Sequence, residues 1–311
     1  MVLKVATIGD RHSIADQDSR DSLVLRAIAH VARTSIESVT PSSAELVVVY
    51  PDRRPFNSRF MSVLADSVLS RITHKQSVLD TTSRIRRFFN VRRGQQILVV
   101  SHENLERSPW RIFGDWLRSS QLPRLTFWPT DMDPGGFRLP NWWNDVDWPE
   151  LPPTASPRET RFGEYLNLDV LCQPQKIDEQ FSLRKRSAAI LTRHLDFPRQ
   201  EILNRLRLHV PVERLAGVPP GSKASAIRNF QFYVASENSI GLGYSTEKVP
   251  EARQAGCIPI GYLNPPFSDF NPDAVFVDPP LQIPDQLPPL LLTRPSLSGL
   301  FDYLSVQLDI G

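Results

Sequence analysis

Short apolar runs alternate with stretches of helical period along the first half of the chain. In chain order, these runs and stretches occupy residues 3–8, 21–34, 45–50, 56–72 and 96–100. Strands separated by helices are typical of βαβ units, whose parallel strands form one sheet. We therefore predict a Rossmann-like domain, extended by an amphipathic helix after Pro109 and a short strand at residues 125–128.

The second half repeats this alternation after an irregular stretch rich in Trp, Pro, Asp and Asn at residues 141–157. The pattern predicts strands at residues 188–192, 230–236, 258–262 and 274–277, and helices at residues 197–207 and 246–255. An irregular stretch between two such patterns is typical of a domain connection. We expect two domains, residues 1–150 and 151–311, with a last helix at residues 296–308 that can pack across both.

Composition excludes several classes of protein. The 311 residues are 41% hydrophobic and 23% charged, as in an ordinary globular chain, and the formal net charge of +2 gives no reason to expect a nucleic-acid partner. The sequence has no run of about 18 apolar residues and no signal core at its start. Cys172 and Cys257 form no Cys-x-x-Cys pair. We expect a cytoplasmic protein with reduced, inert thiols.

Polar residues and glycines are concentrated at residues 233–248, where a predicted strand leads through a Gly-rich turn into a helix. Gly241 and Gly243 allow close backbone approach, and the free N–H groups at the start of a helix favour an anion. Lys248 adds a positive charge, and Glu247 offers an acceptor for sugar or ribose hydroxyls. The simpler alternative is a structural turn with a solvated Glu–Lys pair.

Four motifs resemble, in order and spacing, those of the α1,3-fucosyltransferase family (glycosyltransferase family 10), bacterial type. The family pattern is close to F-E-N, G-Y-x-T-E-K, a-G-x-I-P-I and F-N-P. This chain has Ser236-Glu-Asn238, Gly243-Tyr-Ser-Thr-Glu-Lys248, Ala255-Gly-Cys-Ile-Pro-Ile260 and Phe270-Asn-Pro272. The resemblance implies an α/β GT-B fold, in which two Rossmann-like domains face each other across a cleft. The N-terminal domain would bind the acceptor, and the C-terminal domain would bind GDP-fucose.

The same resemblance implies the donor contacts, which would be Asn238, Tyr244, Glu247 and Lys248. The segment from Phe197 resembles the family's P-x-R-x-x-F-x-x-x-L, which makes Arg199 a second phosphate-binding cation. Cations stabilise the charge that develops on a departing diphosphate. The alternative for Arg199 is a solvated arginine in the first turn of a helix.

In the N-terminal half, Val100-Ser-His-Glu-Asn-Leu-Glu-Arg-Ser-Pro109 resembles the family's G-E-N-x-R-P. The resemblance makes Glu103 the general base, which takes the acceptor's proton in a single inverting displacement. One residue more than the pattern expects separates Glu103 from Pro109, so Glu106 and Arg107 stay open as shifts in register. A helix-capping or loop role for Glu103 is the alternative.

Residues 130–143 resemble the family's acidic pair followed by R-x-P and aromatic residues. The residues expected on the acceptor side are His102, Asp131, Arg138 and Trp142. Asp131-Met-Asp133 also matches the metal-binding D-x-D pattern, but a second copy at residues 145–147 shows how easily that pattern arises by chance. We expect no metal site and no cofactor besides the donor substrate GDP-fucose, and no structural need for a divalent metal.

The departures from the family pattern leave alternatives open. Gly261-Tyr-Leu263 stands where the family often has an aromatic pair, so another nucleotide sugar is a possible donor. Residues 84–93 contain five arginines, which suit either a solvated helix face or an anionic surface. We expect a nucleotide sugar and an acceptor glycan as partners, with peripheral contact at the inner membrane face left open. The competing function is a non-catalytic nucleotide- or anion-binding protein.

Overall fold

The computed structural model describes residues 2–8, 23–50, 81–101, 104–105, 111–129, 131–152, 162–192, 195, 197–237, 239–263 and 269–309. The chain forms two compact units, Met1–Leu139 with Leu297–Gly311, and Pro140–Ser296. The boundary that we expected at residue 150 was therefore wrong. Residues after Pro140 belong to the second unit because Val146 pairs with Leu166 in a β-bridge and Trp142 packs on Phe270.

The first unit is built on a parallel sheet, which has six strands among the described residues. Its order is β2-β1-β3-β4-β5-β6, and every neighbouring pair is parallel. The strands are β1 (Val2–Ile8), β2 (Ser35–Ser38), β3 (Leu46–Val49), β4 (Gln96–Val100), β5 (Arg124–Thr126) and β6 (Phe137–Arg138). All four residues of β3 are buried, as expected of a strand covered on both faces.

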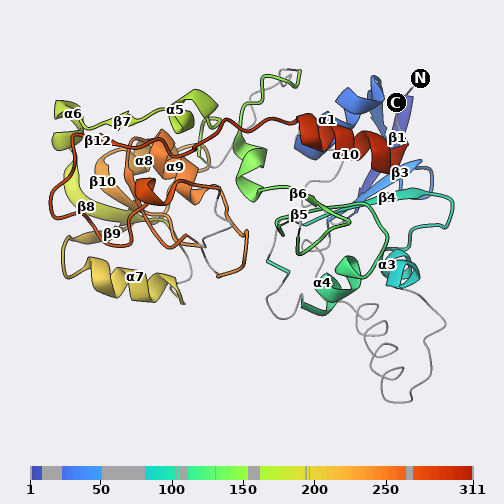
Figure 1. Ribbon diagram of the computed structural model, residues 1–311, viewed down its shortest axis with the longest axis horizontal. Helices are drawn as coiled ribbons and strands as arrows, with labels where there is room; N and C mark the ends of the chain where they lie inside the picture. The colour runs from blue at the N-terminus through green and yellow to red at the C-terminus, as the bar shows by residue number, and fades with distance from the viewer. Residues whose placement is uncertain are drawn as a thin grey trace, which may run out of the picture. The chain divides into compact units, whose positions relative to one another are not determined.

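Helices cover both faces of this sheet (Figure 1). Helices α1 (Leu23–Ala32) and α10 (Ser298–Leu308) lie on one side, and α3 (Thr81–Phe89) and α4 (Arg111–Arg118) lie on the other. The C-terminal helix α10 joins the first unit through stacking of Phe301 on His30, with ring centroids 4.4 Å apart. The Gln96 side chain also donates to the carbonyl of Leu308 over 2.7 Å.

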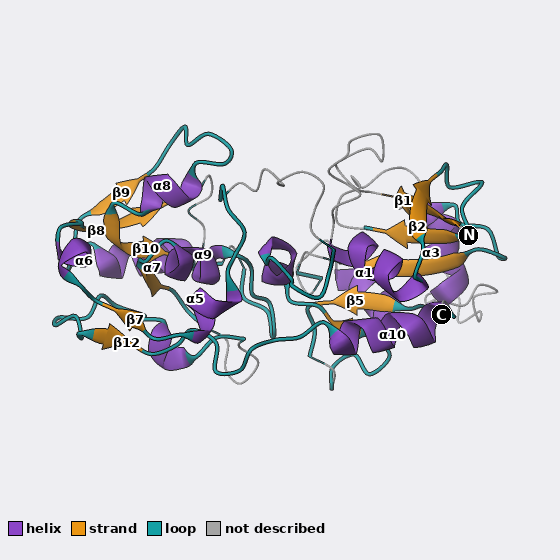
Figure 2. Ribbon diagram, turned by 90° about the horizontal axis from the view of Figure 1, so that it is seen from above, coloured by secondary structure: helices purple, strands orange, loops and turns teal. Residues whose placement is uncertain are grey.

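The second unit has a parallel sheet of order β11-β10-β8-β9 and a small antiparallel pair, β7 and β12 (Figure 2). The strands are β7 (Gln175–Lys176), β8 (Lys185–Ile190), β9 (Val212–Arg214), β10 (Phe230–Val234), β11 (Ile258–Ile260) and β12 (Gln286–Leu287). The helices are α5 (Leu168–Cys172), α6 (Glu179–Ser182), α7 (Arg199–Leu206), α8 (Lys223–Ile227) and α9 (Lys248–Gln254), with short 3-10 helices η3 (Asn141–Asp145) and η4 (Pro272–Ala274).

Strand β10 separates an apolar layer from a charged one. Phe232 and Val234 pack with Ile202 and Leu203 of α7 in the core of the second unit. Because side chains alternate along a strand, Tyr233 points to the opposite face, where α8 and α9 lie. Strand β8 is followed in sequence by β9 on one side, whereas β10 lies on its other side. The order therefore reverses between β8 and β10, the place where open α/β sheets bind ligands.

Most of the predicted elements are confirmed. The strands expected near residues 3–8, 45–50, 96–100, 125–128, 188–192, 230–236 and 258–262 are present, as are the helices expected near residues 21–34, 109–117, 197–207, 246–255 and 296–308. The strand expected at 274–277 was wrong, because η4 occupies its start and Phe276 makes only a single bridge to Ile260. The helix expected at 56–72 lies outside the described residues. The fold class is confirmed, while the cleft between the units stays a prediction.

A buried ion pair closes one edge of the first sheet. The guanidinium of Arg124 donates from Nε and Nη2 to the Asp133 carboxylate, over 2.8 Å for Nε, and the two side chains are 3% and 2% exposed. Tyr303 of α10 accepts from the Arg124 N–H over 2.9 Å. Its hydroxyl lies 3.2 Å from the carbonyls of both Arg124 and Gly135. The pair ties β5 to the following loop, and Tyr303 attaches the C-terminal helix to the backbone of both segments.

We predict that Asp133→Ala destabilises the protein by about 3–5 kcal/mol, because it leaves the buried Arg124 charge without its partner. The exposed pair of Arg118 with Asp115 provides a matched control, since Asp115→Ala is expected to cost about 0–1 kcal/mol. Urea unfolding followed by circular dichroism measures both. Equal losses in the two variants would contradict a structural role for the buried pair.

Candidate functional site

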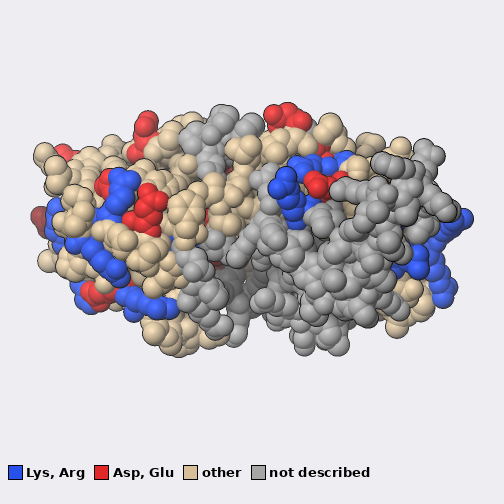
Figure 3. All heavy atoms as spheres, turned by 90° about the horizontal axis from the view of Figure 1, so that it is seen from below, with Lys and Arg blue, Asp and Glu red and all other residues tan. Residues whose placement is uncertain are grey.

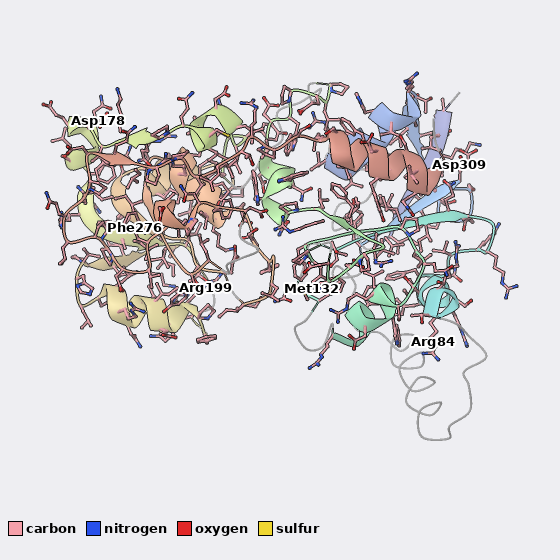
Figure 4. All side chains as sticks on the ribbon, viewed as in Figure 1. Arg84, Met132, Asp178, Arg199, Phe276 and Asp309 are labelled. Atoms are coloured by element: carbon pink, nitrogen blue, oxygen red, sulfur yellow. The ribbon has the colours of Figure 1, made fainter. Side chains whose placement is uncertain are left out.

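Arg199 joins the ends of the two strands at the switch point. Its Nη1 donates to Thr192 Oγ1 over 2.7 Å, just beyond β8, and its Nε donates to the Ser236 carbonyl over 3.2 Å, just beyond β10. The residue is 7% exposed and begins helix α7 (Figure 4). Burial lowers the pKa of the Arg199 guanidinium, and the nearby Glu237 carboxylate opposes that shift. The solvated arginine considered from sequence is therefore wrong.

A small hollow, open to solvent, lies beside this junction. The segments after β10 and β11, together with the Gly-rich turn, form its walls. Residues that line it include Pro198, Ser236, Glu237, Tyr244, Tyr262 and Phe270. Polar carbonyl and carboxylate groups thus face apolar and aromatic surface across one opening, as is common where a small molecule binds.

Glu237 organises the floor of the hollow. Its carboxylate accepts from the Thr246 N–H over 2.7 Å, from the Thr246 hydroxyl over 2.7 Å, and from Lys248 Nζ over 2.8 Å. Lys248 also donates to the Thr246 hydroxyl. A carboxylate with several charge-assisted bonds holds its partners firmly. Glu237 therefore fixes both the turn that precedes α9 and the position of the Lys248 ammonium.

Glu247 lies on the other side of Lys248, with its Oε1 3.7 Å from Nζ. Burial opposes ionisation of this carboxyl, but the charges of Lys248 and Lys223, with hydrogen bonds from the local backbone and Thr246, lower its pKa to about 2. The group is therefore a carboxylate at neutral pH. As an acceptor without a proton of its own, it suits hydroxyl donors.

Of the donor residues predicted from sequence, the structure brings four together. Tyr244 lines the hollow and is buried, and Arg199 and Lys248 bond to the lining residues Ser236 and Glu237. Glu247 lies beside Lys248. Asn238 lies outside the described residues. Helix α9 begins at Lys248 and has seven residues, so it is shorter than expected. We call Arg199, Glu237, Tyr244, Glu247 and Lys248 the switch-point cluster.

The structure describes only some of the residues expected on the acceptor side. Asp131 is exposed in the loop after β5, and Arg138 is half-buried at the end of β6. His102 and the expected base Glu103 lie outside the described residues, as do Glu106 and Arg107. Asp133 is bound to Arg124, so the D-x-D pattern does not present two free carboxylates to a cation.

Trp142 was expected to line the acceptor side, but the structure places it in the second unit. It is 1% exposed, and its indole N–H donates to Asp269 Oδ2 over 3.1 Å. Ser245 of the Gly-rich turn donates to the same oxygen over 2.6 Å. Sequence reasoning missed Asp269 and Glu237, although each adjoins or lies within a quoted motif. Their roles come from pairing across the fold.

Two further expectations concern surfaces. In α3, Ile85, Phe88 and Phe89 are buried and Arg87 is exposed, which fits an amphipathic helix with a basic outer face. Basic and acidic side chains are interspersed on the face drawn in Figure 3.

Among the described residues, no group of three His, Cys, Asp or Glu side chains gathers as metal ligands would, and no helix has the length and apolar character needed to cross a membrane.

Comparison with known proteins finds solved structures with a similar fold. No protein-family model matches the sequence, and no curated protein matches it significantly. Crystal structures of α1,3-fucosyltransferase do match. The structure with GDP has a TM-score of 0.52 at 16% identity, over 89% of this chain and 73% of that one. The structure with GDP-fucose has a TM-score of 0.51 at 18% identity, over 89% and 72%. The chain has the fold of the α1,3-fucosyltransferases.

A third α1,3-fucosyltransferase crystal structure matches with a TM-score of 0.53 at 17% identity, over 89% of this chain and 73% of that one. Such low identities leave the site to be argued from its own residues. Here the switch-point cluster contains the four predicted donor residues that the structure describes, Arg199, Tyr244, Glu247 and Lys248. The motifs and the fold thus lead to the same place in the second unit.

We predict that Glu247→Gln makes the protein less sensitive to acid. Because the folded-state pKa of Glu247 is about 2, below its unfolded value of about 4.3, ionised Glu247 stabilises the folded state above pH 4.3. That stability is lost as pH falls toward about 2. In thermal melts between about pH 5 and about pH 2.5, the melting temperature should fall less steeply for the variant than for the wild type.

The control for this experiment is Glu213→Gln, which removes an exposed carboxylate paired with Lys185 on the same unit. Exposed pairs contribute little to stability, so its acid profile should follow the wild type. A Glu247→Gln profile that also follows the wild type would show that the carboxyl is not held ionised by its neighbours.

Proposed function

We propose that the protein is an inverting glycosyltransferase that moves fucose from GDP-fucose to a hydroxyl of an acceptor glycan, α1,3 to GlcNAc or Glc. The observation that carries the proposal is the switch-point cluster itself. It sets two cations and an ionised carboxylate at the ligand-binding edge of a parallel sheet. The protein also has the fold of α1,3-fucosyltransferases whose structures were solved with GDP and with GDP-fucose.

The chemistry of the cluster supports departure of a nucleoside diphosphate. Breaking the bond between the sugar and GDP leaves negative charge on the β-phosphate, and fixed cations stabilise that charge in the transition state. Arg199 and Lys248 would supply them, both positioned by hydrogen bonds before the ligand arrives. Glu247 and Tyr244 would contact hydroxyl groups of the donor, and Asn238 would complete its contacts.

Glu103 would be the general base on the acceptor side. It follows β4, whose carboxyl end lies at the same edge of the first sheet as the loop that carries Asp131. As the base takes the proton, the acceptor oxygen bonds to the anomeric carbon on the face opposite the departing GDP, so this single displacement inverts the configuration. His102, Asp131 and Arg138 are proposed to lie near the acceptor, and no metal or cofactor is included in this proposal.

A second candidate keeps the mechanism and changes the sugar donor. Tyr262 and Leu263 line the hollow where the family pattern has an aromatic pair, and Tyr262 accepts from Arg205 Nη1 over 3.2 Å. Different side chains on this wall of the hollow favour a donor with a different sugar or nucleotide base. The remaining alternative, a binding protein without catalysis, would need the cluster but not Glu103.

We predict that calorimetric titration detects GDP and GDP-fucose but not UDP or CMP. Lys248→Ala should weaken GDP binding by about tenfold or more, because a charge-assisted bond to phosphate is lost. Lys185→Ala is the matched control, since this lysine is exposed and paired with Glu213 on β9. Preference for UDP would replace fucose with another donor, and binding of no nucleotide would contradict the proposal.

Measuring fucosyl transfer distinguishes an enzyme from a binding protein without catalysis. Glu103→Gln should abolish fucosyl transfer to an acceptor while leaving the GDP affinity within about twofold of wild type, because a base acts on the acceptor and not on the nucleotide. Glu106→Gln tests the shifted register. Loss of activity only in Glu106→Gln would move the base to that residue.

A further inference from the structure

Asp269 joins two segments of the second unit through one carboxylate oxygen. Its Oδ2 accepts from the Ser245 hydroxyl over 2.6 Å and from the Trp142 indole N–H over 3.1 Å. Ser245 belongs to the Gly-rich turn and lines the hollow, whereas Trp142 belongs to η3 and is buried. The family pattern G-Y-x-T-E-K leaves the position of Ser245 open, so the motif gives this residue no role.

The directions of these two hydrogen bonds follow from the groups that make them. An indole N–H can only donate, and an ionised carboxylate can only accept. Both hydrogens therefore point at Asp269 Oδ2, and the hydrogen in the 2.6 Å bond is the one carried by the Ser245 hydroxyl. A hydrogen bond to a carboxylate is strong, so the serine is held as a donor to Asp269.

A serine that donates in this way offers only acceptor capacity to a ligand. Its oxygen keeps two lone pairs, and no donor among the described residues occupies them. Because Ser245 lines the hollow, an O–H or N–H group that enters the hollow can donate to it. Ionised phosphate oxygens only accept, so they gain no hydrogen bond from this serine. The negative charge of Asp269 behind the serine also repels them.

Asp269 is held in place by its neighbours. Trp142 packs on Phe270 with ring centroids 5.7 Å apart, and both rings are buried. Two residues after Asp269, the Asn271 N–H donates to the Leu290 carbonyl over 2.8 Å. The carboxylate is thus positioned before a ligand binds, which lowers the entropic cost of using Ser245 as an acceptor.

We propose that Asp269 is a positioning residue that makes Ser245 a hydrogen-bond acceptor for a hydroxyl group of the donor substrate. The inference rests on the proposed function, in which a nucleotide sugar occupies the hollow. Such a substrate has hydroxyl groups on its ribose and on the sugar to be transferred. Ser245 adds a third hydroxyl contact to those proposed for Tyr244 and Glu247, while the diphosphate is left to Arg199 and Lys248.

The test is calorimetric titration of the full chain with GDP-fucose, GDP and 2′,3′-dideoxy-GDP. Ser245→Ala should weaken binding by about three- to tenfold for the ligands that carry the recognised hydroxyl, because one hydrogen bond is lost. A loss with GDP that disappears with 2′,3′-dideoxy-GDP assigns that hydroxyl to the ribose, and a loss confined to GDP-fucose assigns it to the sugar. An equal loss with all three ligands, or none, would overturn the proposal.

Variants of Asp269 test the positioning role. Asp269→Ala frees the hydrogen of Ser245, so the preference for the ligand with the recognised hydroxyl should shrink by about threefold or more. Asp269→Asn keeps an oxygen that can accept from Ser245 and should retain the preference to within about twofold. The opposite pattern in the two variants would contradict the role. The double variant Asp269→Ala with Trp142→Phe covers failure of the single variant to fold, because it leaves no indole N–H buried without an acceptor.

Ser187→Ala is the matched control. Ser187 also donates to a carboxylate in the second unit, that of Glu213 over 3.2 Å, and is not among the described residues that line the hollow. It should leave all three affinities within about twofold of wild type.

Failure of the proposed donor gives a different result from failure of this inference. If the wild type binds UDP and UDP-glucose in place of GDP and GDP-fucose, the proposed donor is wrong. The same comparison with UDP-glucose, UDP and 2′,3′-dideoxy-UDP then decides the role of Ser245. Binding of GDP-fucose with no change in Ser245→Ala would overturn the inference alone, and binding of no nucleotide would contradict both.

Discussion

The second unit depends on the hydrogen-bonded pair between Glu237 and Lys248. Glu237 follows the end of β10, and Lys248 begins α9, so the contact fastens the helix to the edge of the sheet. Thr246 sits between them and donates to the same carboxylate through its N–H and its hydroxyl. The Gly-rich turn is therefore held at both ends. That constraint gives the hollow beside it a defined floor.

The pair also governs how charge is distributed around the hollow. Buried cations that lie close together repel one another, and each must be stabilised by a neighbouring group. Arg199 is held by the Ser236 carbonyl and the Thr192 hydroxyl, which are neutral acceptors. Lys248 is held by a carboxylate instead. An incoming anion would compete with Glu237 for Lys248, whereas at Arg199 it would approach a guanidinium that is hydrogen-bonded to a carbonyl and a hydroxyl. The two cations thus differ in what binding requires of them.

Much of the fold could be predicted from sequence because the strands of both sheets are buried and strongly apolar. The runs at β3, β4 and β10 bury nearly every residue, so period and length identify them. Short elements such as β9 and α8 leave no periodic signal of comparable strength. The sequence pattern predicted the C-terminal helix but not the unit to which it belongs. The helix joins the first unit through contacts with His30 and, from Tyr303, with Arg124, and such contacts between distant residues leave no local pattern. Local motifs located Arg199, Tyr244, Glu247 and Lys248. They could not show that Trp142 belongs with Asp269, 127 residues later in the chain.

The surroundings of Lys223 differ from what the neighbouring sequence motif indicates. In the sequence it closes Gly217-Val-Pro-Pro-Gly-Ser-Lys223, which resembles a phosphate loop only superficially. In the structure its ammonium is turned into the protein, toward Glu251 and Tyr233, and not toward a ligand. The buried pair of Lys223 and Glu251 instead joins helix α8 to helix α9, because Glu251 lies one turn after the start of α9. A local pattern can locate a lysine, but its partner 28 residues later in the chain is set by the fold.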